Sequence, residues 1–279
     1  ALARSEGERP SAAELRGRCS EGESGDWWRA RLASAAQTGA LAEAEPLAGE
    51  RTSWPLVGRE RELAVLSELF ASLSTAPPRA AIAWLVGPEG SGKWRLAGAF
   101  AEHLRERAAP PLLLDARWSD ADEARPAGTV LRLLNRWLGL AVGRAPSERE
   151  ARRLTERLGP AQARVLLAAL DPKNAGSIDR SVAAELARFL GKLSEERPML
   201  VFLDDLHQAG AETLDALSSV LEHLRGAPIL FVLSLREDVP AAEAGLLARL
   251  AERLARAAAD GGPRCARLEL APLDEVAVA

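Results

Sequence analysis

A short stretch, GPEGSGKWR at residues 87–95, has the residue types and the spacing needed to bind phosphate. Its glycines would let backbone N–H groups curl around the phosphates of a nucleotide, and its lysine would pair with their charge. The residues that this pattern places against the nucleotide are Gly87, Gly90, Ser91, Gly92, Lys93 and Trp94. The last of these is unexpected, because the pattern ends in Ser or Thr, whose hydroxyl binds Mg²⁺. The stretch therefore predicts nucleotide binding but leaves open whether the bound nucleotide is hydrolysed.

Two apolar runs downstream end in residues that could complete such a site. LVFLDD ends in Asp204 and Asp205, and ILFVLSLR ends in Arg236. In a parallel sheet, ligands bind where the strands end, so these residues and the glycines should gather at one edge. A glycine loop followed by an apolar strand that ends in paired aspartates is a strong signal for a nucleotide site. For Arg236 two roles are open, contact with phosphate or capping of the sheet edge.

The elements that must position these residues alternate between strands and helices. Short apolar runs such as AAIAWLV, LLLDAR and MLVFLD predict buried strands, and turn residues separate them from helical stretches. Helices are predicted at about 128–139, 147–158, 160–170, 178–195 and 241–258. The pattern predicts an α/β fold of the three-layer P-loop NTPase kind, with a parallel sheet of about five strands and helices on both faces. Residues 1–54 contain few large aliphatic side chains and predict a disordered or partly helical arm.

Composition excludes several classes of function. The 279 residues carry 36 basic and 40 acidic side chains, a net charge of -4, which gives no basis for direct binding of nucleic acid or of an anionic membrane. No apolar run approaches the roughly 20 residues of a membrane span. The two cysteines, Cys19 and Cys265, are far apart, so neither a disulfide framework nor a zinc site is expected. These features together favour a cytoplasmic location.

Four segments, in order, resemble the AAA ATPase domain of bacterial STAND-class regulators, which include LuxR-type activators and kinases with an attached ATPase module. They are PLVGRERELAVL, GPEGSGKWRL (the Walker A loop), LVFLDDLHQAG (the Walker B strand) and ILFVLSLRED (the sensor strand). The resemblance spans about residues 55–275. It implies that Val57 and Gly58 pack near adenine, that Asp204 organises Mg²⁺ and that Asp205 orients the attacking water. It places Arg236 where many members close the sensor strand with arginine.

The sequence departs from that family at two motifs. An indole at Trp94 offers no oxygen to Mg²⁺, a cation that requires oxygen ligands. Gln208 and Gly210 stand where members commonly have Trp and Asp, a milder change that leaves both aspartates in place. The domain, residues 55–279, is also expected to lack the lid that follows in the family. Residues 8–15, ERPSAAEL, resemble the last segment of a Ser/Thr protein kinase domain, although a chance capping sequence explains them equally well.

The function predicted from these observations is an adenine-nucleotide-binding regulatory module of a multidomain bacterial signalling protein, with impaired Mg²⁺-dependent hydrolysis. Its ligands would be ATP or ADP, with Mg²⁺ in question, and its partners other domains of a longer chain: a kinase upstream, and a lid and helical repeats downstream. The alternative is an active, slow ATP-hydrolysing switch in which Lys93 stabilises the phosphate charge and Arg236 assists. A DNA-binding regulator is a third class, but its DNA-binding domain would have to lie beyond residue 279.

Overall fold

The structure, a computed structural model, describes residues 56–118, 128–140, 145–171 and 180–271. Both the predicted arm, 1–54, and the kinase-like stretch within it lie outside these residues. The described residues form a sheet of five strands, all of them parallel. The strands are β1 (Ala81–Val86), β2 (Leu112–Arg117), β3 (Met199–Asp204), β4 (Ile229–Leu235) and β5 (Arg264–Glu269).

The strand order across the sheet is β2-β3-β4-β1-β5. Every residue of β1, β3 and β4 is buried, as continuous apolar runs predict for strands covered on both faces. Because the strands are parallel, their C-terminal ends meet at one edge, called here the carboxyl edge. This edge carries the residues that follow β1, β3 and β4 and the last residue of β2.

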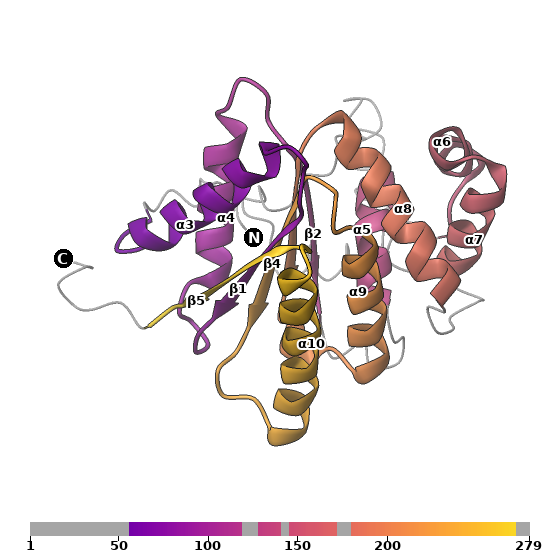
Figure 1. The fold of residues 1–279 in the computed structure, drawn as a ribbon. Helices are drawn as coiled ribbons and strands as arrows, with labels where there is room; N and C mark the ends of the chain where they lie inside the picture. Colours follow the sequence, from indigo (N-terminus) through magenta and orange to yellow (C-terminus); the bar gives the residue numbers. More distant parts are fainter. Residues whose placement is uncertain (1–55, 119–127, 141–144, 172–179, 272–279) are drawn as a thin grey trace, which may run out of the picture. The chain divides into compact units, whose positions relative to one another are not determined.

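Helices cover both faces of the sheet. Figure 1 shows α3 (Glu60–Ala71) and α4 (Lys93–Arg105) on one side, and α5 (Gly128–Leu138), α8 (Arg180–Glu196), α9 (Ala211–His223) and α10 (Ala241–Ala259) on the other. Two further helices, α6 (Glu148–Leu158) and α7 (Pro160–Leu170), pack on α8 away from the sheet. Short 3₁₀ turns, η3 (Ser72–Ser74) and η6 (Leu206–Gln208), follow α3 and β3. The predicted three-layer α/β fold is therefore confirmed.

Alternating side chains of each strand divide the core into two clusters. Ala83, Leu85 and Phe202 pack with α3 and α4, whereas Trp84 and Leu203 point into the cluster under the other helices. Successive strand residues face opposite sides of a sheet, so this division follows from the sequence alone. Phe202 and Asp204, two residues apart, consequently share the face covered by α4.

Helix ends follow local signals in the sequence. Ser147 and Glu150 form a capping box before α6, with the Ser147 backbone N–H donating to Glu150 Oε2 at 2.6 Å. Gly159 ends α6 and precedes Pro160, which begins α7. Within the described ranges, no helix is both long enough and apolar enough to cross a bilayer.

Candidate functional site

The glycine loop (residues 87–92) connects the end of β1 to the start of α4. Gly90 and Gly92 have φ values of 76° and 86°, a left-handed conformation that costs other residues strain. Gly92 is the N-cap of α4, so the first backbone N–H groups of this helix face the loop without helical partners. A helix N-terminus at a glycine loop is well suited to an anion such as phosphate.

Lys93 lies at the first position of α4 with its ammonium group inside the loop. Its Nζ donates to the carbonyl oxygens of Gly87 at 2.8 Å and Pro88 at 2.9 Å, and lies 3.5 Å from Ser91 Oγ. The side chain is buried, and this burial lowers the pKa of Lys93 from its ordinary value, partly offset by the charges of Asp204 and Asp205. The predicted phosphate-binding lysine is therefore held inside the loop by backbone carbonyl oxygens.

Gly87 has no room for a side chain. A Cβ there would lie 2.5 Å from the carbonyl oxygen of Leu270 and 2.9 Å from Ser91 Oγ. The close neighbour is held in place, because the Leu270 backbone N–H donates to Val86 O at 2.7 Å where β5 ends beside β1. The first glycine of the motif is thus required by the packing of the chain after β5.

We expect Gly87→Ala to lower the free energy of unfolding by about 1–3 kcal/mol, the usual cost of forcing an extra methyl group into a packed site. Ser91 could turn away, but the backbone at Leu270 would have to shift. The measurement is the thermal midpoint by circular dichroism. Gly245→Ala, inside α10 with nothing within 4 Å of the added Cβ, is the control and should leave the midpoint equal or higher. Equal midpoints for both variants would contradict the packing described.

Asp204 and Asp205 lie where β3 ends, and Ser234 of β4 links them. The Ser234 hydroxyl donates to Asp204 Oδ1 and accepts a hydrogen bond from the Asp205 backbone N–H at 3.1 Å. Asp204 is buried, and this burial raises its pKa above the ordinary value, against the lowering effect of the Ser234 hydroxyl. Asp205 has a left-handed backbone, φ 59°, which begins the turn η6. The predicted pair of carboxylates is present at the carboxyl edge and is held by a neighbouring strand.

Arg117, the last residue of β2, was not predicted as a site residue. Its Nε lies 2.8 Å from Asp205 Oδ2 and 3.4 Å from Asp204 Oδ2. In the sheet it is the register partner of Asp204. The sequence does not show that β2 and β3 are neighbours, so it could not place Arg117 beside the aspartates. The one signal in the sequence was a basic residue at the end of an apolar run.

Arg236 follows β4 and reaches the glycine loop through an acidic residue. Its guanidinium group pairs with Glu89 Oε2 at 2.9 Å and forms two hydrogen bonds with Asp238, at 3.0 and 2.7 Å. The hydrogen bond that Arg236 donates to Asp238 is the main reason why the pKa of Arg236 is raised. Arg236 thus lies at the carboxyl edge, where it is paired with the carboxylates of Glu89 and Asp238.

Trp94 lies in the first turn of α4 and packs against β3. Its side chain is 41% exposed, and its ring centroid lies 5.2 Å from that of the fully buried Phe202. Phe202 precedes Asp204 by two residues on the same face, so the indole lies beside the strand end where a hydroxyl was expected. The indole is therefore partly covered by β3, and it brings no oxygen to this position.

The residues present do not match the Mg²⁺ site that the glycine-loop motif implies. Trp94 offers no oxygen ligand, Asp204 uses one oxygen for Ser234, and Arg117 pairs with the other and with Asp205. Over the residues that the structure describes, no cluster of three or more His, Cys, Asp or Glu side chains could hold a metal ion.

Arg59 lies just before α3, in a charged run at residues 58–62, and is nevertheless buried. Its guanidinium donates to Ser91 O at 3.2 Å and to Ala271 O, and pairs with Glu62 at 3.1 Å. Arg59 therefore ties the glycine loop to the chain after β5. Val57, predicted to pack near adenine, is 42% exposed in front of α3, and Gly58 has a φ of 69°.

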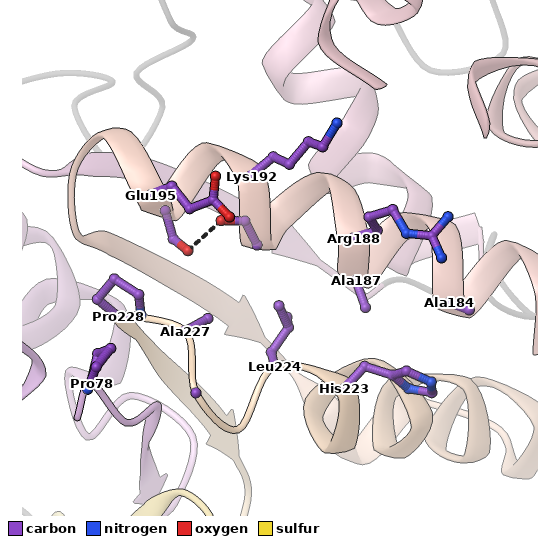
Figure 2. A pocket seen from close by; sticks show the side chains of 13 residues that line it. Pro78, Ala184, Ala187, Arg188, Lys192, Glu195, His223, Leu224, Ala227 and Pro228 are labelled. Carbon is purple, nitrogen blue, oxygen red and sulfur yellow. Dashed lines mark hydrogen bonds between the residues drawn. The ribbon is translucent and has the colours of Figure 1, made fainter. Parts of the chain in front are cut away.

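A separate pocket of about 770 Å³ lies at the opposite, amino edge of the sheet. Figure 2 shows its lining between α8 and the connection from α9 to β4, with Leu224, Ala227 and Pro228 on one side and Ala187 on the other. Lys192 extends away from it and donates to Arg157 O at 3.2 Å. This pocket receives none of the predicted site residues.

Comparison with known proteins places these observations in context. The family described as AAA ATPase domain matches residues 55–232, more than half of the chain. No curated protein matches the sequence. Among solved structures, Cdc6p from Pyrobaculum aerophilum is 14% identical with a TM-score of 0.46, over 83% of this chain and 50% of that one.

Two structures from Aeropyrum pernix are similar to the same extent. The ORC1 protein in complex with DNA is 19% identical with a TM-score of 0.45, over 83% of this chain and 50% of that one. The ORC2 protein in its ADPNP-ADP complexes is 17% identical with a TM-score of 0.43, over 79% of this chain and 50% of that one. The present chain thus spans about half the length of each of these structures.

Proposed function

Because the chain belongs to the AAA ATPase domain family, we propose that it binds an adenine nucleotide at the glycine loop and that it hydrolyses this nucleotide poorly or not at all. The observation that carries the proposal is the position of Lys93, at the N-terminus of α4 with its buried ammonium group inside the loop. An ammonium held by carbonyl oxygens can exchange them for phosphate oxygens, which bind it more strongly.

Helix α4 supports the same site. Its first N–H groups and its dipole favour negative charge at the loop, beside the lysine. The left-handed glycines at 90 and 92 leave open space where a Cβ would stand, so a phosphate can approach the backbone there. In this proposal Val57 and Gly58, before α3, lie near the adenine. Ser91 and Gly92 supply backbone donors.

Impaired hydrolysis is proposed from the carboxyl edge. Catalysis of phosphoryl transfer relies on positioned metal ions and on residues that orient the nucleophile. Trp94 removes one oxygen ligand, and a missing ligand in such a site costs several kcal/mol of transition-state stabilisation, enough to make turnover negligible. In this proposal the bound nucleotide determines the conformation of the domain. The chain would then act as a regulatory module of a multidomain bacterial signalling protein of the STAND class.

The second candidate is a slow ATP-hydrolysing switch of a transcriptional regulator or a kinase-linked ATPase. It is favoured by Asp204 and Asp205, which are both present at the end of β3 and are both fixed by Ser234. In that case Asp205 would orient the attacking water and Arg236 would leave Asp238 to stabilise the phosphate charge.

Two measurements on the chain test the proposal. Isothermal titration should detect binding of ATP and ADP, and phosphate release with ATP and Mg²⁺ should stay at the level of an Asp205→Asn variant. Release well above that level would favour the slow switch. Absence of any nucleotide binding would contradict both candidates.

A further inference from the structure

We infer that Arg117 is the built-in cation of this nucleotide site, neutralising Asp204 and Asp205 in place of a divalent metal, so that the nucleotide binds without Mg²⁺. The inference rests on the proposed function, because it concerns the same loop and the same carboxylates. It explains how a domain without the hydroxyl ligand can bring two aspartates close to the phosphates of a nucleotide.

Backbone pairing fixes the position of Arg117. Residues of β2 and β3 pair in parallel from Leu112 with Met199 to Arg117 with Asp204. Beyond that pair, the Trp118 backbone N–H donates to Asp204 O at 3.0 Å. Arg132 of α5 donates to the Arg117 carbonyl oxygen from the other side. The α-carbon of Arg117 is thus held beside the aspartates, and its side chain needs no induced movement to reach them.

Charge at the carboxyl edge calls for a cation at this point. Two carboxylates near a triphosphate would repel it, and the repulsion is strong where Asp204 is buried. The other two cations of the site are engaged elsewhere: Lys93 with the loop carbonyls, and Arg236 with Asp238 and Glu89. Among the described residues, Arg117 is the arginine that pairs with both aspartates.

The guanidinium group suits this role chemically. It stays charged throughout the physiological pH range, and its hydrogen bond with Asp205 raises its pKa further. The recorded ion pairs use Nε, so the terminal nitrogens supply four further N–H donors. The side chain is 66% exposed, which leaves these donors accessible to phosphate oxygens. Arginine can therefore bridge carboxylates and phosphate as a metal ion otherwise would.

The test measures the dissociation constant for ATP by isothermal titration, once with excess MgCl₂ and once with excess EDTA. The unmodified chain should bind ATP equally under both conditions. Arg117→Gln should lose at least about tenfold in affinity in EDTA, about 1.4 kcal/mol, and should recover most of it with Mg²⁺, because a free metal can now reach the aspartates. Arg117→Lys, which keeps the charge, should resemble the unmodified chain.

Arg253→Gln is the matched control, since Arg253 also pairs with two carboxylates, Asp215 and Glu222, on the outer helices. It should leave both dissociation constants unchanged. The inference is overturned if the unmodified chain needs Mg²⁺ for binding, or if Arg117→Gln binds ATP normally in EDTA, or if its loss is the same with and without Mg²⁺. A requirement of the unmodified chain for Mg²⁺ overturns the inference even if Arg117→Gln fails to fold, and Arg117→Lys then tests the role of the charge. A chain that binds no ATP under either condition refutes the proposed function instead.

Discussion

Replacing Lys93 with alanine is expected to weaken ATP binding by at least about tenfold, or about 1.4 kcal/mol. The Lys93 side chain extends from the start of α4 into the glycine loop, and its ammonium group lies where the motif places the phosphates. Charge-assisted hydrogen bonds from an ammonium to phosphate are among the stronger polar contacts, and no other residue of the loop carries positive charge. Because Lys93 binds phosphate directly, the loss should be similar with Mg²⁺ and with EDTA.

A second lysine provides the control for this experiment. Lys192 of α8 also donates to a backbone carbonyl oxygen, that of Arg157, but it lies away from the carboxyl edge. Lys192→Ala should therefore bind ATP like the unmodified chain. Thermal midpoints of both variants should be compared, since Lys93→Ala also removes the hydrogen bonds to Gly87 and Pro88. A folded Lys93→Ala variant that retains full affinity would refute the phosphate-binding role of the loop.

The elements of this fold could be predicted from the sequence because their signals are local. Apolar runs predicted the strands β1, β2, β3 and β4, and the helices at 160–170 and 241–258 were predicted to within one residue of α7 and α10. The Ser147–Glu150 capping box marked the start of α6. Each of these signals depends on neighbours in the chain, so no knowledge of the tertiary structure was needed.

The partners of the site residues could not be predicted in this way. Ser234 binds Asp204 and Arg117 pairs with it only because β4 and β2 lie on either side of β3, an order that the sequence does not encode locally. Arg59 lies in a charged run of the sequence, yet its contacts at Ser91 and Ala271 come from distant segments. The residues that were missed owe their roles to contacts between distant segments. The glycine loop and the paired aspartates could be predicted because each belongs to a short sequence motif.

Replacing Trp94 with serine is expected to make ATP binding depend on Mg²⁺ and to raise ATP hydrolysis above that of the unmodified chain. The substitution restores a hydroxyl at the first turn of α4 and removes the indole that packs on Phe202, next to the end of β3. A serine oxygen is a suitable ligand for a hard cation, and an indole is not. Hydrolysis is followed as phosphate release under single-turnover and steady-state conditions, and affinity by titration with and without Mg²⁺.

Three further variants separate the effect of the hydroxyl from other changes. Trp94→Phe keeps an aromatic ring but adds no oxygen, so it should remain independent of Mg²⁺. Asp205→Asn in the Trp94→Ser background should abolish the gained hydrolysis while sparing binding. In the double variant Trp94→Ser, Arg117→Gln, ATP binding should depend on Mg²⁺ even more than in Trp94→Ser, because the guanidinium group and the metal compete for the same two carboxylates. If the unmodified chain already hydrolyses ATP as fast as Trp94→Ser, the site is active despite its indole, and the slow switch is the correct function.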